Sequence, residues 1–342
     1  MSRARRIASA AAYGGGGVGL LGVVGGAALY GLILGESKLA RRRIPAALTD
    51  PPVSHDTTWT GPDVDPAQPP IRMAMLGDST AVGYGAHRER DTPGARIAIG
   101  ISAVAHRPVH LTNVAVVGAE SSMLLEQVAR VIDHLDLAVI VVGTNDVTHR
   151  IKVDDAVHYL GDAVRILRAS GAEVVVGTCP DLGTIRPIAQ PLRYIARRLS
   201  RNLAAGQTIA VVEAGGRTVS LGDLLGPLFA QRRDMFSEDK FHPSAQGYAH
   251  AADAILPSAL DALGLRTRAR SASAFTTRRA RPVAKAAVQA AARPGTEVEG
   301  VEVHGETAGR RGRWARLRRR RPQRPLATSP EQARPVQDSV HA

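Results

Sequence analysis

The stretch "IRMAMLGDSTAVGYG", residues 71–85 of this 342-residue chain, contains an abrupt change from apolar to small and polar residues. A strand-like apolar run ends at Gly77, Asp78 and Ser79, and small residues follow. Gly, Asp and Ser commonly end strands, so turn formation alone accounts for the break. The alternative is a nucleophilic serine at the carboxyl end of a strand, where open parallel sheets bind their ligands. The rest of the chain has to distinguish the two hypotheses.

Alternating strand and helix patterns predict an α/β fold for residues 71–265. Apolar runs predict strands, and amphipathic stretches predict helices. The expected strands lie at 71–76, 109–117, 137–143, 172–178 and 208–214, and the expected helices lie at 91–106, 121–132, 153–170, 191–205 and 243–263. In the first of these helices we expect Asp91 as the N-cap, with Pro93 just inside. This alternation predicts βαβ units and a mostly parallel sheet that is covered on both faces.

The formal net charge of +13 belongs to the two ends of the chain. Residues 1–50 contain seven Lys and Arg against two Asp and Glu, and residues 266–342 contain 18 against 6. The central part is therefore mildly acidic. The positive net charge of the chain is therefore a property of its two ends. It is not evidence that the central domain binds nucleic acid.

The N-terminal segment, residues 1–43, contains an uncharged run of 29 residues, 7–35. About 20 residues of helix suffice to cross a bilayer core, so we expect a membrane anchor here. A cleavable signal peptide is the competing interpretation, because basic residues precede the run and small residues lie within it. Basic residues flank the run on both sides in similar number, so the positive-inside comparison gives no orientation.

Two further segments flank the α/β domain. Residues 44–70 are Pro-rich and have no helical or strand period, which predicts a connector. Residues 266–342 are rich in Arg, Ala and Pro, which predicts a mostly disordered tail. The tail is either simply solvated or binds an anionic lipid or polymer. Nucleic acid is disfavoured, because Trp314 is the only aromatic residue near the Arg-rich run and no recognition module is present.

Few other residues indicate special chemistry. The single cysteine, Cys179, follows an apolar run and is expected to be a buried core residue. His87, His149 and His158 lack a set of companion ligands, so we expect surface or helix-face positions and no metal site. His149 could still line the site described next, because it follows Asn145 by four residues. No phosphate-binding glycine loop with Lys and Ser or Thr occurs, and no cofactor is expected.

Four stretches together favour nucleophilic catalysis over simple turns. "LGDST" contains Ser79, "NVAVVGAESS" contains Gly118 and "VVGTNDV" contains Asn145, each at the end of a predicted strand. "DKFHPSAQGY" places Asp239 three residues before His242. A serine hydroxyl needs a base within hydrogen-bonding reach, and that base needs a partner on its other ring nitrogen. Each stretch alone has an ordinary structural explanation, but that explanation does not account for all four in this order.

These stretches resemble the sequence blocks of the SGNH hydrolases, also called the GDSL esterase/lipase family, which are named for a Ser, a Gly, an Asn and a His. The resemblance covers residues 70–264, and the one departure is Thr80, where the family usually has Leu. It implies a three-layer α/β/α sandwich resembling flavodoxin, with five parallel strands in the order 2-1-3-4-5. No G-x-S-x-G elbow surrounds the serine, which argues against an α/β-hydrolase.

The resemblance also implies a catalytic triad and an oxyanion hole. Ser79 would attack an ester carbonyl, His242 would act as general base, and Asp239 would orient it. The oxyanion would be held by the N–H groups of Ser79 and Gly118 and by the side chain of Asn145. Loss of one such donor typically costs about 3–4 kcal/mol of barrier.

Three functions stay open at this point. The first is an esterase or lipase acting on a small-molecule or lipid ester. The second is an O-acyltransferase or deacetylase of envelope glycans or lipids, which uses the same residues. The third is a membrane-tethered binding protein with an inactive site. No strongly apolar insertion occurs, so short to medium acyl chains are favoured, with residues 220–236 as the candidate lid or acyl surface. A tethered hydrolase suits an extracytoplasmic location, or secretion if the N-terminal segment is cleaved.

Overall fold

A six-stranded sheet forms the centre of the molecule, with the strand order β1-β3-β2-β4-β5-β6. The computed structural model describes residues 35–36, 56–265, 281–282, 287, 301–303 and 306–308. The strands are β1 (Asp56–Trp59), β2 (Ile71–Gly77), β3 (Val109–Asn113), β4 (Leu137–Val141), β5 (Glu173–Gly177) and β6 (Arg217–Val219). Strands β2 to β6 are parallel, and β1 pairs antiparallel with β3.

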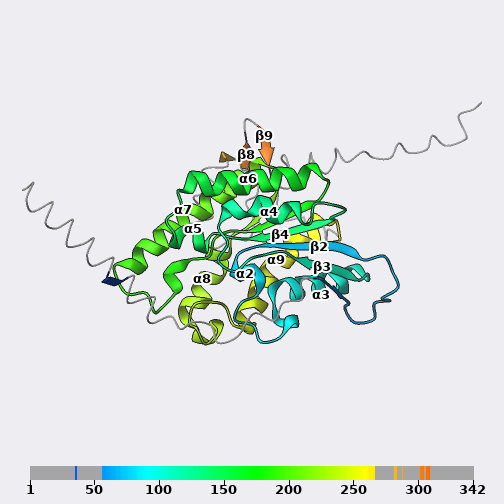
Figure 1. Ribbon diagram of the computed structural model, residues 1–342, viewed down its shortest axis with the longest axis horizontal. Helices are drawn as coiled ribbons and strands as arrows, with labels where there is room; N and C mark the ends of the chain where they lie inside the picture. Colours follow the sequence, from blue (N-terminus) through cyan, green and yellow to red (C-terminus); the bar gives the residue numbers. More distant parts are fainter. Residues whose placement is uncertain are drawn as a thin grey trace, which may run out of the picture.

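Helices cover both faces of this sheet (Figure 1). One face carries α4 (Leu124–Ala129), α6 (Val153–Ala169) and α7 (Leu192–Glu213). The other face carries α3 (Pro93–Ala105), α8 (Leu221–Gln231) and α9 (Ala245–Ala262). Two short helices, α2 (Ser79–Val82) and α5 (Thr144–Thr148), follow the carboxyl ends of β2 and β4.

Side-chain alternation along the central strand supplies both hydrophobic cores. Met73 and Met75 of β2 face the core under α3 and α9, whereas Ala74 and Leu76 face the core under α4 and α6. All four residues are fully buried. A strand buried on both faces is expected to be continuously apolar, and β2 is apolar from Met73 onward, with the exposed Arg72 near its start. The two cores therefore hold the carboxyl end of β2 in one place.

The architecture agrees with the sequence prediction in its layers and in its parallel strands. Strands β3, β2, β4, β5 and β6 lie in the predicted 2-1-3-4-5 order. The sheet has five parallel strands, as predicted, but six strands in all, because β1 adds an antiparallel strand at the edge. Strand β1 lies within residues 44–70, where we expected a connector without strands. It has only four residues, too few for a visible period, and the partly buried Trp59 packs on the core.

Two local predictions are also corrected. Residues 208–214 are not a strand but lie almost entirely in the last turns of α7, and the fifth parallel strand is β6. The buried residues Leu203, Gln207 and Val211 recur every four positions, so the β-branched run continues the apolar face of a helix. At α3 the N-cap is Thr92 and not Asp91, since the Thr92 hydroxyl accepts the Ala95 N–H at 3.3 Å; Pro93 is the first helical residue as predicted.

The predicted terminal segments fall largely outside the described residues. Positions 1–34, 37–55 and most of 266–342 lie outside the described residues, and the predictions made for them stay predictions. In the residues that are described, we find no helix that is long and apolar enough to span a bilayer. Within the segment predicted to be mostly disordered, β7 (Arg281–Pro282), β8 (Val301–Val303) and β9 (Glu306–Ala308) pair into a small sheet.

Candidate active site

Ser79 is the first residue of α2, directly beyond the carboxyl end of β2. The chain turns there at Gly77, whose φ is +132°, and a Cβ on this residue would overlap the carbonyl oxygen of Val141. Only glycine fits such a position. Asp78 then caps α2, because its carboxylate accepts the N–H of Thr80 at 2.9 Å. These local features present the Ser79 side chain at the edge of the sheet with 5% of its surface exposed.

Ser79, His242 and Asp239 form a continuous hydrogen-bonded chain. The Ser79 Oγ lies 2.9 Å from His242 Nε2, and His242 Nδ1 lies 2.6 Å from Asp239 Oδ2. An ionised carboxylate only accepts hydrogen bonds, so Nδ1 carries the proton and Nε2 of the neutral ring accepts from the hydroxyl. The serine and the histidine are 163 positions apart in sequence. The fold thus brings together the two stretches that the sequence prediction combined.

The loop that carries His242 is tied by its own carboxylate. Asp239 Oδ1 accepts hydrogen bonds from the Ser237 hydroxyl at 2.7 Å and from the N–H groups of Phe241 and His242 at 2.8 and 2.9 Å. Burial alone would raise the pKa of Asp239, but these hydrogen bonds and the one from the His242 ring outweigh it and lower the pKa to about 2. The carboxylate is therefore ionised throughout the neutral range, and its imidazole partner is held in one orientation.

Two aromatic rings pack against the imidazole. The ring centroid of Tyr84 lies 4.7 Å from that of His242, and Phe241 lies edge-on at 4.9 Å. The carbonyl of Tyr84 accepts the hydroxyl of the fully buried Tyr248 at 2.7 Å. This chain of contacts links α9 to the loop after α2, and it restricts rotation of the His242 ring.

The loop with Gly118 is bonded to α5, which carries Asn145. The Asn145 side-chain amide donates to the Ala119 carbonyl at 3.0 Å. Next to it, the buried Asp146 accepts the Ser121 N–H at 3.1 Å and the Ser121 hydroxyl at 2.9 Å. Burial raises the pKa of Asp146. These bonds hold the two predicted oxyanion-hole segments against each other.

Three N–H donors remain available in this region. Gly118 is exposed, with φ +84°. Within residues 56–265, the backbone N–H of Ser79 and that of Gly118 have no protein acceptor. Asn145 uses one of its two amide hydrogens on Ala119, and the second is free to bind a ligand. The arrangement therefore offers the donors that an oxyanion requires.

A buried carboxyl lies between the Ser79 and Asn145 segments. Asp78 is 1% exposed, and burial raises its pKa to about 6, against the effect of hydrogen bonds from the backbone of Thr80 and Thr144. Because Thr144 begins α5, the carboxyl of Asp78 joins the start of α2 to the start of α5. This residue was quoted in the sequence prediction only as part of a turn.

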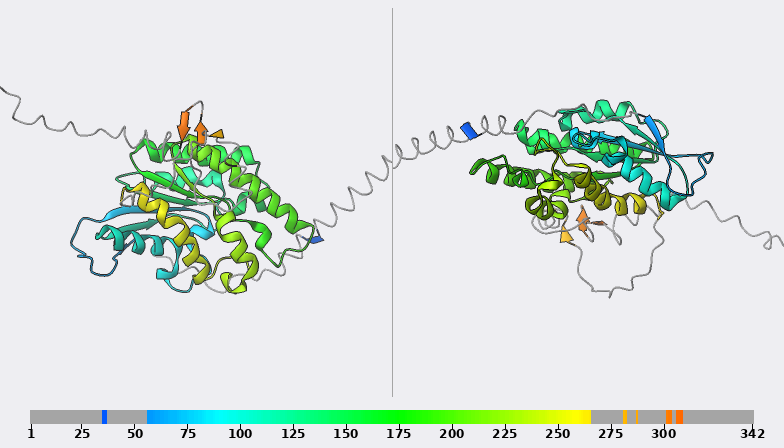
Figure 2. Two further views of the ribbon diagram at one scale, coloured as in Figure 1. Left: turned by 180° about the vertical axis from the view of Figure 1, so that it is seen from behind. Right: turned by 90° about the horizontal axis from the view of Figure 1, so that it is seen from below.

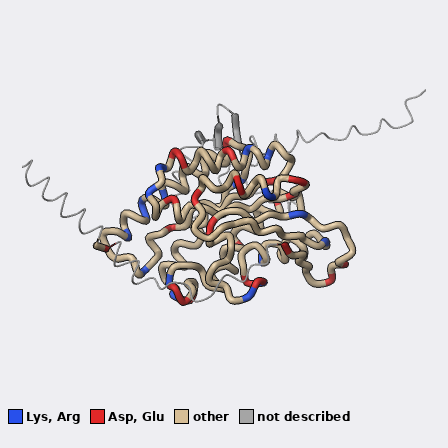
Figure 3. Tube along the Cα trace, in the orientation of Figure 1, with Lys and Arg blue, Asp and Glu red and all other residues tan. Residues whose placement is uncertain are grey.

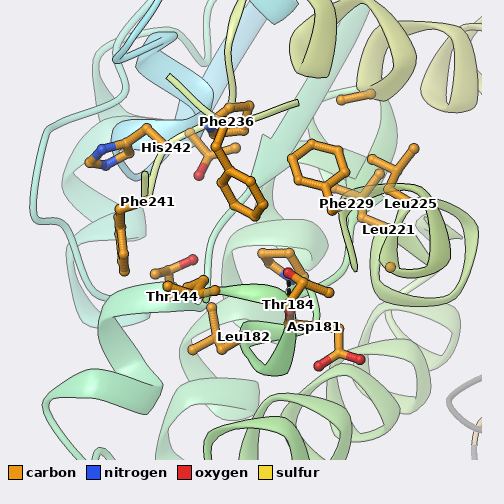
Figure 4. A pocket seen from close by; sticks show the side chains of 16 residues that line it. Thr144, Asp181, Leu182, Thr184, Leu221, Leu225, Phe229, Phe236, Phe241 and His242 are labelled. Atoms are coloured by element: carbon orange, nitrogen blue, oxygen red, sulfur yellow. Dashed lines mark hydrogen bonds between the residues drawn. The ribbon is translucent and has the colours of Figure 1, made fainter. Parts of the chain in front are cut away.

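An apolar pocket opens beside His242 (Figure 4). It encloses about 660 Å³ including its solvent-open mouth. His242 and Phe241 lie on one side, and Leu221 and Leu225 lie on the opposite side (Figure 4). Its walls come from the irregular stretch 179–190, from residues 220–236, which the sequence analysis singled out, and from the histidine loop. Residues 220–236 fold mainly as α8, so the segment predicted as a lid or acyl surface is one wall of the pocket.

The cysteine and the other histidines considered in the sequence analysis lie outside the hydrogen-bonded triad. Cys179 is 1% exposed, and burial raises the pKa of its thiol, in agreement with a core residue. His149 ends α5 and contacts Glu120 of the Gly118 loop, with 2.7 Å between Nδ1 and Oε1. His87 and His158 are exposed. No cluster of three or more His, Cys, Asp or Glu with metal-binding geometry occurs in the part of the chain described.

The sequence matches the GDSL-like lipase/acylhydrolase family over residues 75–250, about half of the chain. The chain belongs to this family. A GDSL-like esterase of Mycobacterium tuberculosis is 40% identical over 243 residues, which cover 68% of this chain and 77% of that protein. This member of the GDSL-like family is an ester hydrolase.

Solved structures with a similar fold are more distant in sequence from this GDSL-like hydrolase. A lipase/acylhydrolase from Enterococcus faecalis is 18% identical with a TM-score of 0.43, and covers 55% of this chain and 94% of its own. An extracellular lipase from Streptomyces rimosus is 18% identical with a TM-score of 0.41, and covers 55% of this chain and 99% of its own.

Sequence reasoning missed the buried amides that hold the strand ends of this GDSL-like hydrolase. Gln207 of α7 accepts the Cys179 N–H at 2.7 Å and donates to the Val142 carbonyl at 2.9 Å. It lies on the apolar face of its helix, as Gln127 does on α4. The sequence does contain a signal for these residues, because each is a polar residue on the otherwise largely apolar face of its helix.

Proposed function

We propose that this protein is a serine esterase that cleaves carboxylic esters through an acyl-enzyme on Ser79. The observation that carries the proposal is the hydrogen-bonded chain from the Ser79 hydroxyl through His242 to Asp239, with distances of 2.9 and 2.6 Å. This is the arrangement of nucleophile, base and orienting carboxylate that activates a serine hydroxyl.

The three residues of the triad act in sequence in the proposed reaction. As Ser79 Oγ attacks the carbonyl carbon, its proton passes to His242 Nε2, and the imidazolium that forms is stabilised by the ionised Asp239. His242 then gives this proton to the leaving alcohol, which leaves an acyl group on Ser79. In the second half, His242 takes a proton from water as the water oxygen attacks the acyl carbon. His242 then returns this proton to Ser79 Oγ, which releases the carboxylic acid and restores the free enzyme.

We assign the oxyanion to the free donors of Ser79, Gly118 and Asn145. Negative charge develops on the carbonyl oxygen in both tetrahedral intermediates, and donors fixed in place cost little reorganisation. The bonds from Asn145 to Ala119 and from Ser121 to Asp146 support this assignment, because they keep the donors in place before substrate arrives.

The acyl chain is assigned to the apolar pocket beside His242. Leu182, Leu225 and Phe229 are among its lining residues, and burial of each methylene there would be worth about 0.8 kcal/mol. The enclosed part of this pocket is small, which supports an acyl group of short to medium length. We therefore propose a preference for such esters over long-chain lipids.

The predicted anchor and extracytoplasmic location are retained as proposals. The anchor is supported by the uncharged run of residues 7–35, and the Glu36 that follows it accepts the N–H of Leu192 on the catalytic domain at 2.9 Å. The extracytoplasmic location rests on the argument that a tethered hydrolase suits a substrate there. Protease digestion of intact and broken cells, followed with an antibody to the domain, tests the location. Digestion only after the cells are broken would overturn it.

The activity is tested with the full chain in detergent, as wild type and as Ser79→Ala, on p-nitrophenyl esters from acetate to palmitate. A fluorophosphonate probe reports the nucleophile independently. We expect the wild type to hydrolyse and to label, with a maximum at short or medium chains, and Ser79→Ala to do neither. Ser122→Ala, an exposed neighbour of the Gly118 loop, is the matched control and should behave as wild type.

A folded wild type that neither hydrolyses nor labels would overturn the esterase proposal. Labelling without hydrolysis would instead favour acyl transfer to an alcohol, which is then tested by adding acceptor alcohols. Retained labelling in Ser79→Ala would reject the assignment of the nucleophile.

A further inference from the structure

The N-terminal half of α7 is poorly covered by the rest of the domain. Figure 2 shows this helix extending past the sheet at one end of the molecule. Its first buried residue is Ser200, although the helix begins at Leu192. Two full turns of a long helix therefore lie at the surface and contribute little to the core.

This surface is basic and carries exposed apolar side chains. Residues 192–201 include four arginines and no acidic residue. Tyr194 is 61% exposed and Leu199 is 39% exposed. In Figure 3, Lys and Arg gather at the end of the molecule where α7 lies. Arginine with exposed Tyr and Leu is the composition of helices that lie in a membrane interface.

A depression adjoins this part of the helix. It encloses about 600 Å³ including its open mouth, and Arg186, Arg193, Arg197 and Tyr194 line it. Arg197 pairs with Asp181, and Arg186 donates to the carbonyl of Ala230 at 2.7 Å.

Two of the arginines on this surface form no ion pair with a described acidic residue. For Arg193 and Arg198, no acidic partner is found among the residues that the structure describes. Their charge is therefore available to an anion in solution or on a surface.

The N-terminal part of the chain reaches the same end of the domain. Glu36 Oε2 accepts the backbone N–H of Leu192, the first residue of α7, at 2.9 Å. In Figure 1 the short described piece with Glu36 lies at this end of α7. Glu36 is also the first charged residue after the uncharged run of residues 7–35. The segment predicted to enter a bilayer thus ends beside the basic surface.

We propose that the N-terminal half of α7 is a docking surface for a membrane that contains anionic phospholipid. The arginines would lie at the phosphate level, with one headgroup phosphate in the depression, and Tyr194 and Leu199 would enter the interface. Each basic residue near an anionic surface strengthens binding several-fold. The exposed apolar side chains and the end of the uncharged run favour a bilayer over a soluble polyanion.

The docking places the pocket mouth close to the lipid surface. Thr184 lines both the basic depression and the apolar pocket beside His242. An ester held in the membrane surface would have a short path to the pocket. This consequence rests on the proposed esterase function, whereas the docking itself does not.

Docking is measured with a fluorescent dye that is attached to α7 in the full chain. Leu199→Cys is labelled with an environment-sensitive dye, and the native Cys179 stays unlabelled because it is 1% exposed. Val104→Cys on α3, which replaces a side chain that is 46% exposed, is the matched label position. The protein is mixed with vesicles of phosphatidylcholine alone or with added phosphatidylglycerol, and some vesicles contain a nitroxide lipid as quencher.

We expect the dye at position 199 to shift to the blue and to be quenched only when phosphatidylglycerol is present. High salt should reverse the change, because it screens the attraction. Arg193→Glu with Arg198→Glu should reduce the change at least about threefold. Arg90→Glu with Arg130→Glu, which makes the same charge change at exposed positions of other elements, should leave it intact. The dye at position 104 should not respond.

Three results would overturn the proposal. The first is an unchanged dye at position 199 on vesicles with phosphatidylglycerol, and the second is an equal response at position 104. The third is the same response to polyphosphate without lipid, which would assign the surface to soluble polyanions. Thermal unfolding checks the fold of each variant, and Arg198→Glu alone with the salt series replaces the double variant if that one unfolds. Hydrolysis of a water-soluble ester is measured separately, so failure of the esterase proposal is distinguishable.

Discussion

The side chain of Gln127 holds both backbone groups of Gly77. Its Oε1 accepts the Gly77 N–H at 2.7 Å, and its Nε2 donates to the Gly77 carbonyl at 3.0 Å. Gln127 is 2% exposed and belongs to α4, on the face of the sheet opposite α3 and α9. Because Ser79 follows Gly77 by two residues, this helix determines where the chain leaves the sheet and where the nucleophile lies.

Replacement of Gln127 by Met should destabilise the protein and slow the reaction. The side-chain volume is nearly kept, but the buried Gly77 N–H loses its partner, at about 1–3 kcal/mol, whereas the Gly77 carbonyl keeps the Val116 N–H at 3.1 Å. We expect the free energy of unfolding in urea to fall by about 1–3 kcal/mol. The rate of hydrolysis should fall as the Asp78–Ser79 segment shifts. Gln231→Met, at an exposed position on α8, should stay within about 0.5 kcal/mol of wild type. Equal stability of the two variants would contradict this role for Gln127.

Asp239→Asn should lower kcat by about 10³- to 10⁴-fold with little change in KM. The amide does not supply the negative charge that stabilises the imidazolium, and it favours the wrong tautomer of His242. Steady-state kinetics on an acetate ester measure the effect. Glu238→Gln removes a charge at the exposed neighbouring position and should keep full activity. A loss of less than tenfold in Asp239→Asn would show that this carboxylate does not orient the base.

The stability that this carboxylate contributes should be lost only in acid. The pKa of Asp239 is lowered to about 2, so its contribution is complete above about pH 4 and is lost as the pH falls toward 2. Unfolding of wild type and Asp239→Asn, compared across this window, should show the wild-type advantage shrinking as the pH falls. A constant difference would be inconsistent with an ionised, hydrogen-bonded Asp239.

Asp78 should give the opposite pH dependence. Its pKa in the folded protein is raised to about 6, so the folded state binds a proton more tightly than the unfolded chain and gains stability as the pH falls. Relative to Asp78→Asn, wild type should gain about 2 kcal/mol of unfolding free energy between pH 7.5 and pH 4. Urea titrations at several pH values measure this difference. No change in the difference across the window would place the pKa of Asp78 near its ordinary value.

Leu225→Trp should shorten the range of accepted acyl chains. Leu225 lies across the pocket from His242 (Figure 4), so an indole there would fill the far end. Loss of contact with two methylenes is worth about 1.6 kcal/mol, so kcat/KM for an octanoate ester should fall roughly tenfold while acetate is unaffected. Leu228→Trp on the same helix does not line the pocket and serves as control. An equal fall in kcat/KM for both esters would contradict the assignment of the acyl chain to this pocket.

Much of the site could be predicted because its residues lie at strand ends. Ser79, Gly118 and Asn145 each follow an apolar run, and the carboxyl ends of parallel strands meet at one edge of a sheet. The spacing of Asp239 and His242 is local, so one turn of chain sets it. These features depend on short-range pattern and turn chemistry, which a sequence displays directly.

Other elements were not predictable from local pattern. The four residues of β1 became a strand only because β3 offers a free edge with which they pair. The β-branched run at 208–214 is helical because Val211 packs under the sheet with the rest of α7. In both cases tertiary contacts override a weak local preference.

The sequence by itself determined the α/β class, because periodicity and turn residues encode it over a few positions. The four motif stretches identified the candidate catalytic residues, and the family resemblance that they carry implied the strand order. Only the tertiary structure decided that Ser79 meets His242, that Gln127 clamps Gly77, and that two inserts close an apolar pocket beside the site. Those features depend on distances between residues far apart in the chain. Packing of both cores against one sheet sets these distances, and no short segment contains that information.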